Sequence, residues 1–191
     1  MEQTRLRILF LANVPSPYRV EFFNVLGLEC DLTVLYQLHS SAERDKKWTA
    51  QADTCYAQVY LKGRATSVDK ALCPGVIPWL QKNWDAIVIS GNTSPTELLA
   101  IAWCKLRGIP YCLEADGAFP GSGRGLKELI KTQAVRGAAM YLSTCRELDK
   151  YYLHYGAEAQ RIRRYRFSSL GETDILPRCP SREEKNAIRG E

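Results

Sequence analysis

Two kinds of segment alternate along this chain: short runs rich in apolar residues, and longer stretches with helical spacing. The apolar runs occupy residues 8–11, 31–38, 59–61, 86–90, 109–113 and 140–143. Such runs are typical of strands buried on both faces. Helices are predicted between them at residues 18–26, 74–84, 95–107, 126–134 and 146–155. Alternating strands and helices predict an α/β fold, a Rossmann-like parallel sheet with helices on both faces.

The first strand–helix unit has the clearest boundaries. Pro15 ends the apolar run, Ser16 suits the N-cap, and Pro17 suits the first helical position. In a doubly wound sheet this loop borders the ligand crevice. Arg19 lies in the first turn, where the helix dipole disfavours a cation. Two interpretations are open: Arg19 and the N–H groups of the turn hold an anion such as a phosphate or carboxylate, or Arg19 is solvated on the outer side of the helix.

The fourth strand is followed by the same design. Ser94 suits the N-cap, Pro95 the first helical position, and Glu97 completes a capping box. In the doubly wound order the first and fourth strands flank the point where the winding reverses. The loop with Asn92 and the helix start at Ser94 are then expected to face the same crevice as Ser16. The alternative is that Ser-Pro merely starts helices well.

The fifth predicted strand runs into two carboxylates and a glycine. Glu114 and Asp116 lie two residues apart, so on a strand they share a face. Carboxylates at the point where a strand leaves the core cost free energy unless they have a partner or a function. One of the two can act as a base or bind a hydroxyl group. Asp116 is the predicted catalytic residue, because it falls at the carboxyl end of a strand; a simple turn at Asp116 and Gly117 is the alternative.

Residues 117–125 contain four glycines, yet they match neither the G-x-G-x-x-G nor the Walker A pattern. They are predicted to form a flexible loop over the crevice. The following helix carries Lys127 and Lys131 four residues apart, hence on one face. This face is either simply solvated or directed at an anionic acceptor or a membrane surface.

Composition places the chain among ordinary globular proteins. Its 191 residues are 46% hydrophobic and 25% charged, and the net charge of +5 permits an anionic ligand or membrane surface without requiring one. The seven cysteines form no Cys-x-x-Cys pair and there are only two histidines, so reduced thiols are expected and a metal site is not. With no visible signal peptide or membrane-spanning run, a cytoplasmic location is expected, with the inner face of the membrane as an alternative.

The C-terminal fifth of the chain differs in character. Residues 161–166 are strongly basic, but no nucleic-acid-binding motif accompanies them, so no nucleic acid partner is predicted. Residues 171–180 have the composition of a linker, and Ser181 with Glu184 indicates one more helix start. The predicted division is a Rossmann-like domain at 1–170, followed at 171–191 by a linker and the start of a helix leading to an absent C-terminal domain. A short docked helix is the alternative.

Taken together, six segments resemble the N-terminal half of GT-B glycosyltransferases of family 4, especially bacterial enzymes that build surface polysaccharides. They are residues 13–19, 43–45, 94–95, 114–117, 127–131 and 165–169. The resemblance implies one half of a GT-B fold, an acceptor-binding domain whose missing C-terminal partner domain binds the nucleotide-sugar. The implied activity is retaining sugar transfer to a glycan or lipid-linked acceptor, with no cofactor and no metal. The chain alone is then expected to have little or no activity.

The resemblance also implies roles for individual residues. The loop with Pro15 and Ser16 would lie under the diphosphate and sugar of the donor, with Arg19 near it. Asp116 stands where relatives set a polar residue, often histidine, against the transferred sugar, so its carboxylate departs from the pattern. Lys127 and Lys131 would face an anionic acceptor or lipid surface.

Two other classes of protein compete with this interpretation. One is a stand-alone, non-catalytic half that pairs with a separate donor-binding polypeptide. The other is a nucleotide-dependent oxidoreductase, which is disfavoured because the first strand–helix turn lacks the glycine fingerprint.

Overall fold

A computed structural model of the chain describes residues 5–39, 54–121, 123, 125–166 and 178–189. Its main element is a seven-stranded sheet with the order β3-β2-β1-β6-β7-β8-β9, in which every neighbouring pair is parallel. The strands are β1 (Arg7–Ala12), β2 (Asp31–Tyr36), β3 (Ala57–Tyr60), β6 (Ala86–Ser90), β7 (Cys112–Ala115), β8 (Met140–Ser143) and β9 (Ile162–Arg164). A small antiparallel hairpin is formed by β4 (Arg64–Ala65) and β5 (Ala71–Leu72).

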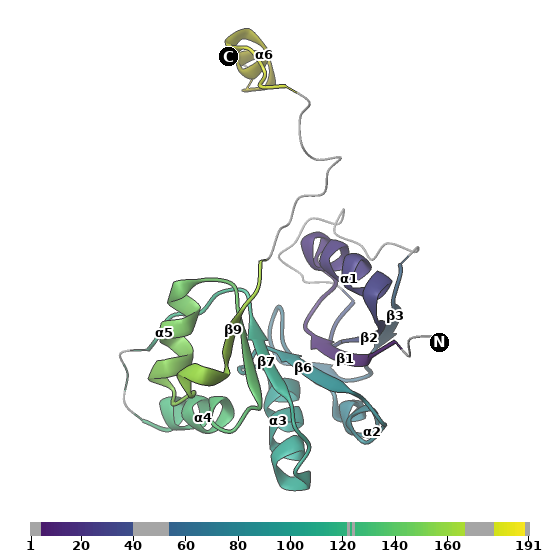
Figure 1. Cartoon of the computed structure of the whole chain (residues 1–191), viewed down its shortest axis with the longest axis vertical. Coiled ribbons are helices and arrows are strands. Elements are labelled where there is room, and N and C mark those ends of the chain that lie inside the picture. The colour runs from purple at the N-terminus through teal and green to yellow at the C-terminus, as the bar shows by residue number, and fades with distance from the viewer. Residues whose placement is uncertain (1–4, 40–53, 122, 124, 167–177, 190–191) are drawn as a thin grey trace.

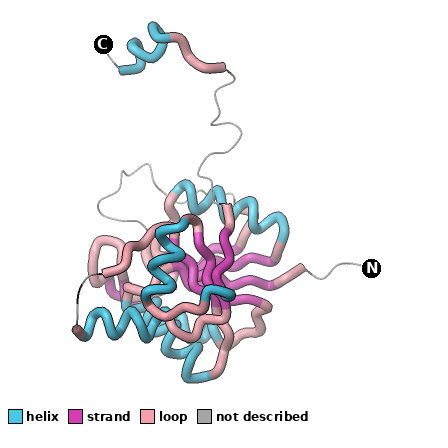
Figure 2. The backbone as a smooth tube through the Cα atoms, turned by 60° about the vertical axis from the view of Figure 1, so that its left-hand side comes forward, coloured by secondary structure: helices cyan, strands magenta, loops and turns pink. Residues whose placement is uncertain are grey.

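Helices cover both faces of this sheet (Figures 1 and 2). They are α1 (Pro17–Glu29), α2 (Ile77–Leu80), α3 (Pro95–Arg107), α4 (Leu126–Val135) and α5 (Arg146–His154), with 3-10 turns at η1 (Pro74–Val76) and η2 (Ala159–Arg161) and a separate C-terminal α6 (Arg182–Arg189). Among these helices, none is long and apolar enough to cross a lipid bilayer.

Alternating side chains of β1 show why the strand is apolar throughout. Leu9 and Leu11 pack in a core shared with α2 to α5, whereas Phe10 packs with Phe23 of α1 in the core on the opposite face. Both faces therefore exclude water, and the predicted α/β fold with helices on both faces is confirmed. β1 pairs with β2 on one side and with β6 on the other, so the winding reverses between β1 and β6, as the doubly wound order requires.

Four local predictions were wrong, each for a physical reason. The helix predicted at 74–84 is divided into η1 and the short α2, because Pro78 lacks the N–H that would bond to the Pro74 carbonyl in a continuous α-helix. β7 begins at Cys112 and not at residue 109, because the N–H of Ile109 closes the end of α3 by bonding to the carbonyl of Cys104. Strand β9 was missed, because its two arginines are exposed at the sheet edge. The spacing of Thr144 and Glu147 predicts a capping box at the start of α5, but the N-cap is Cys145 and carries no side-chain cap bond, so this box is not formed.

The predicted C-terminal helix is present as α6. The main-chain N–H of Glu184 donates to the Ser181 hydroxyl, and the N–H of Ser181 donates to the Glu184 carboxylate, so this capping box is confirmed. Most of the predicted linker at 171–180 lies outside the described residues, as do residues 43–45 and 167–169 of the resemblance. The division of the chain at residue 170 stays a prediction.

Candidate functional site

A cavity of about 440 Å³ opens at the carboxyl ends of β1, β6 and β7. Two loops that leave the sheet in opposite directions border it: the loop after β1, with Asn13, and the loop after β6, with Asn92. This is the position where doubly wound sheets bind ligands, because diverging loops leave a crevice there. Residues from the first turns of both helices, Arg19 of α1 and Glu97 of α3, therefore line one cavity, whereas the two Ser-Pro pairs themselves do not.

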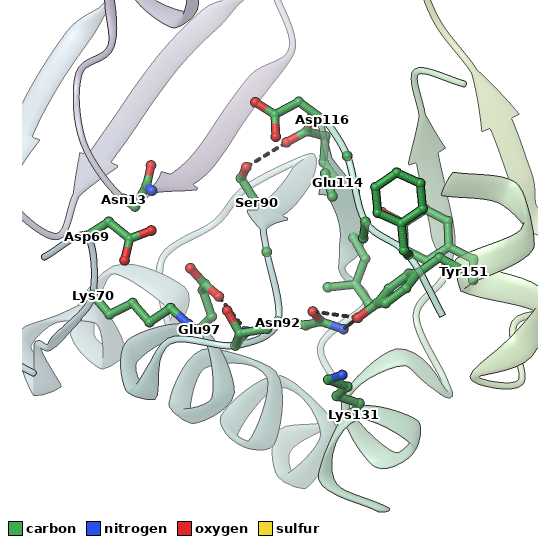
Figure 3. A pocket seen from close by; sticks show the side chains of 18 of the residues that line it. Asn13, Asp69, Lys70, Ser90, Asn92, Glu97, Glu114, Asp116, Lys131 and Tyr151 are labelled. Carbon is green, nitrogen blue, oxygen red and sulfur yellow. Dashed lines mark hydrogen bonds between the residues drawn. The ribbon is translucent and has the colours of Figure 1, made fainter. Parts of the chain in front are cut away.

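Segments far from these loops complete the walls of the cavity. Asp69 and Lys70 come from the hairpin that ends in β5, and in Figure 3 they lie across the cavity from Tyr151 of α5. Lys131 of α4 lies on the lower side, below Asn92. The cavity thus brings together hydroxyl, amide, carboxylate and ammonium groups from elements far apart in the sequence.

A buried ion pair forms the floor of the cavity. The Arg19 side chain is only 7% exposed and Glu114 only 1%, and Nη2 of Arg19 lies 3.1 and 3.0 Å from the two oxygens of Glu114. The Ser90 hydroxyl donates to Glu114 Oε2 at 2.6 Å, and the Tyr165 hydroxyl donates to Oε1 at 2.5 Å. Burial lowers the pKa of Arg19, but the charges of Glu114 and Asp116 outweigh it, so that this pKa is raised above its usual value.

This pair explains why a cation stands in the first turn of α1. Glu114 supplies the negative charge that offsets both the burial of Arg19 and the helix dipole. The interpretation of Arg19 as a solvated side chain is wrong, because the residue is 6% exposed. The anion that Arg19 contacts in the structure is the protein's own carboxylate.

Asp116 follows β7 directly and lies at the rim of the cavity. Its side chain is 44% exposed, and its Oδ2 lies 3.4 Å from Arg19 Nη2 and 3.3 Å from the Tyr18 hydroxyl, which donates to it. The Thr144 hydroxyl donates to the Asp116 carbonyl oxygen at 3.4 Å. Glu114 and Asp116 meet the same guanidinium, as their predicted common face requires. Of these two carboxylates, Asp116 is the one that remains accessible to a ligand.

The loop after β6 is held by a complete capping box. The Ser94 hydroxyl accepts from the N–H of Glu97 at 3.1 Å and donates to Gln37 Oε1 at 2.9 Å. Glu97 Oε2 accepts from the N–H groups of Thr93 and Ser94. Gly91 has a φ of +100°, and a Cβ there would lie 2.7 Å from Glu97 Oε2. Ser94 is therefore a support for the loop, whereas Glu97 also lines the cavity.

Asn92 joins this loop to α5. Its side-chain amide donates to the Tyr151 hydroxyl at 2.9 Å, and the two side chains point toward one another in Figure 3. Both residues line the cavity, so one hydrogen-bonded pair from two distant elements forms part of its wall.

A second charged cluster lies beside the glycine-rich loop. Lys131 Nζ lies 3.0 Å from Glu128 Oε1, and the Tyr155 hydroxyl donates to Glu128 Oε2. These hydrogen bonds, first from Tyr155 and then from Lys131, lower the pKa of Glu128. The N–H of Gly121 donates to the Tyr155 hydroxyl at 3.1 Å, which ties the loop to α5. Lys127, four residues earlier than Lys131, is exposed and lies outside the cavity lining.

The predicted site residues divide into two groups. Those that line the cavity are Arg19, Asn92, Glu114, Asp116, Gly117 and Lys131. Those that do not are Pro15, Ser16, Ser94 and Lys127. Pro15 and Ser16 are buried in the turn between β1 and α1, where the N–H of Ser16 donates to the Val14 carbonyl at 2.9 Å. Ser16 occupies the N-cap as predicted, but its side chain makes no cap bond.

Several lining residues were not predicted. They are Asn13, Tyr18, Asp69, Lys70, Ser90, Glu97, Phe119, Tyr151 and Tyr152. The two tyrosines of α5 resemble ordinary core residues, and both are buried. Asp69 and Lys70 lie in a short hairpin without a hydrophobic period, so their only signal was a charged pair between two apolar segments. In the part of the chain that the structure describes, no group of three His, Cys, Asp or Glu side chains is placed to hold a metal ion.

Comparison with known proteins adds evidence on the fold. No family model and no curated protein matches the sequence. Among solved structures, HepE from Anabaena in complex with UDP matches with a TM-score of 0.53 at 12% identity, over 85% of this chain and 44% of that one. A UDP-N-acetylglucosamine 2-epimerase from Rickettsia bellii matches with 0.50 at 12% identity, over 84% and 44%. A further UDP-N-acetylglucosamine 2-epimerase matches with 0.52 at 14% identity, over 83% and 47%.

These likenesses define the class of the fold. The chain has an α/β Rossmann-like fold that matches one half of GT-B-like enzymes that use nucleotide-sugars. It spans a little under half of the length of the solved proteins it matches. At these sequence identities the likeness concerns the fold alone, so a particular family and a particular reaction are matters of proposal.

Proposed function

We propose that the chain is the acceptor-binding N-terminal domain of a retaining glycosyltransferase, which moves a sugar from a nucleotide-sugar to a glycan or lipid-linked acceptor. The observation that carries the proposal is Asp116, a partly exposed carboxylate at the rim of a cavity at the switch point of a GT-B-type half. A carboxylate so placed can accept a hydrogen bond from a hydroxyl of the transferred sugar. The UDP bound by HepE, a protein of the same fold, supports a nucleotide-linked donor.

The chemistry of the cavity supports a carbohydrate ligand. Its lining offers the phenol groups of Tyr18 and Tyr151, the amide of Asn92, the carboxylate of Asp116 and the ammonium group of Lys131. Donors and acceptors of this variety match a ligand rich in hydroxyl groups. A volume of about 440 Å³ lies within the range of ordinary small-molecule sites.

The surface of α4 supports a lipid-linked acceptor and a peripheral membrane contact. Leu126, Leu129 and Ile130 are 73%, 55% and 42% exposed, and their spacing puts them on one helix face. Lys127, also exposed, adds a positive charge beside them. An exposed apolar face with a basic neighbour is the arrangement that binds at the surface of anionic membranes.

The donor-binding half is proposed to be a C-terminal domain, and a separate donor-binding polypeptide is the second hypothesis. Both fit the observation that the matched proteins are about twice as long as this chain. Intact mass of the protein from its native source separates them. A mass near twice 21.6 kDa favours one two-domain transferase, and a mass equal to 21.6 kDa favours a paired half.

The proposal is tested with the complete native protein and a panel of nucleotide-sugars, by following release of the nucleotide in the presence of acceptor. Replacing Asp116→Asn is expected to lower turnover by about 100-fold or more, the effect of removing one preorganised polar group from a reacting centre. Asp31→Asn, at an exposed strand start, is the matched control and is expected to keep full activity. Interconversion of UDP-N-acetylglucosamine with its 2-epimer, without transfer, would replace the transferase proposal by an epimerase.

A further inference from the structure

Tyr165 comes from the far edge of the sheet and contacts the buried ion pair of the cavity floor. It follows β9, and its N–H donates to the carbonyl of Ser143 at 3.0 Å. Its hydroxyl donates to Glu114, and its ring centroid lies 5.9 Å from that of Phe22. Phe22 belongs to α1, the same helix as Arg19. Tyr165 therefore contacts both elements that carry the buried ion pair.

A short chain of contacts leads from Tyr165 to Asp116. The Tyr165 hydroxyl binds Glu114, Glu114 binds Arg19, and the same Nη2 atom of Arg19 lies 3.4 Å from Asp116. Arg19 thus serves two carboxylates with one guanidinium group. Only Asp116 of these two is open to the cavity, because Glu114 is 1% exposed.

The division of Arg19 between the two carboxylates depends on what else binds Glu114. A buried carboxylate must have its charge compensated, and hydroxyl donors share that task with the cation. Ser90 and Tyr165 are these donors, at 2.6 and 2.5 Å. Burial raises the pKa of Tyr165, and the charge of Glu114 and its hydrogen bond raise it further, so the phenol stays a proton donor at neutral and mildly alkaline pH. Without this donor, Glu114 draws Arg19 away from Asp116.

We propose that Tyr165 and Glu114 are positioning residues for Asp116, and that they act through Arg19. Glu114 then binds no substrate, since its oxygens accept from Arg19, Ser90 and Tyr165. The inference rests on the proposed function for its kinetic consequence, but its structural part concerns the chain alone. It assigns a task to a residue that lies 49 positions beyond Asp116 in the sequence.

The structural part is tested by NMR on this chain with ¹⁵N-labelled arginine. In the wild type, the contacts of Arg19 are expected to slow rotation of its guanidinium group, so that its N–H resonances are resolved. Tyr165→Phe is expected to change this rotation rate by about 2- to 10-fold, because Arg19 gives up its contact with Asp116 and binds Glu114 more closely, an exchange on the scale of one hydrogen bond. Tyr60→Phe is the matched control, because it removes another partly buried phenol, bonded to Gln58 in β3 at the opposite edge of the sheet. Unchanged Arg19 resonances in Tyr165→Phe would overturn the proposal.

The kinetic part uses the complete native protein. Tyr165→Phe is expected to lower kcat about 5-fold with little change in the KM of the nucleotide-sugar, and to add nothing when combined with Asp116→Asn. A structural role alone would lower the melting temperature and leave kcat of the folded protein unchanged, which would overturn the inference. If the wild type transfers no sugar, the proposed function fails, and the NMR result still decides whether Tyr165 holds the cavity floor.

Discussion

The buried pair of Arg19 and Glu114 gives a quantitative prediction for stability. Arg19→Met removes the cation and keeps the length of an apolar side chain in the first turn of α1. The change leaves Glu114, only 1% exposed, without its charge partner. Leaving one member of a buried ion pair uncompensated costs about 3–5 kcal/mol.

The contacts in the structure place the expected cost at the lower end of that range. Glu114 keeps two hydroxyl donors, Ser90 and Tyr165, which continue to stabilise its charge. We therefore expect Arg19→Met to lower the free energy of unfolding by about 3 kcal/mol. The double variant Arg19→Met/Glu114→Leu removes both charges and is expected to cost only about 1 kcal/mol, because an apolar pair can replace a buried ion pair.

Urea unfolding of the chain, followed by circular dichroism, measures these differences. With a slope of roughly 2 kcal/mol per molar urea, Arg19→Met lowers the midpoint by about 1.5 M. Arg161→Met is the matched control: its ion pair with Glu158 is exposed, with side chains 44% and 62% accessible, and is expected to contribute less than about 1 kcal/mol.

Two results would refute this account of the cavity floor. The first is an Arg19→Met variant as stable as the Arg161→Met control. The second is an Arg19→Met/Glu114→Leu variant whose loss of unfolding free energy equals the sum of the losses in Arg19→Met and in Glu114→Leu. Two groups that compensate each other's charge cannot contribute independently.

Two further predictions concern the loops around the cavity. Ser94→Ala removes an N-cap hydrogen bond and is expected to lower the free energy of unfolding by about 1–2 kcal/mol, measured by thermal or urea unfolding. Ser16→Ala changes an N-cap without a side-chain bond and is expected to cost less than about 0.5 kcal/mol. Equal losses in the two variants would contradict the difference between the two caps. The pKa of Glu128 is lower in the folded chain than its usual value of 4.5. Its charge therefore stabilises the fold at pH values above 4.5, and this stabilisation is lost as the pH falls through the pKa of the folded chain. Glu128→Gln should therefore lose less of its stability between pH 6 and pH 3 than the wild type, and equal urea-midpoint shifts in the two proteins would contradict this assignment.

The fold was largely predictable, because the signals for it are local. Continuous apolar runs mark strands that are covered on both sides, and the capping box at Ser94 with Glu97 forms as its spacing indicates. The predicted helix at 74–84 failed for a local reason, the second proline of the segment. Strand β9 was not predicted for a tertiary reason: the neighbouring strand β8 supplies its hydrogen bonds, and its own arginine-rich sequence is not typical of a strand.

The candidate site was predictable only in part. Arg19, Glu114 and Asp116 were identified because charged residues at strand and helix ends conflict with their local surroundings, and all three meet at the cavity. The sequence offered no means of pairing Arg19 with Glu114, since 95 residues separate them. The walls formed by Lys70 and Tyr151 likewise come from segments whose own sequences suggest a turn and an apolar helix face.

The sequence by itself determined the order of strands and helices apart from β4, β5 and β9, the two Ser-Pro helix starts and the position of Asp116 after a buried strand. These features depend on neighbours within a few residues, where backbone geometry and apolar spacing act directly. Only the tertiary structure decided that Arg19 is buried against Glu114, that Ser94 supports its loop, and that Tyr165 bonds to Glu114. The physical reason is that burial and charge compensation arise from contacts between distant segments, which exist only after the sheet has assembled.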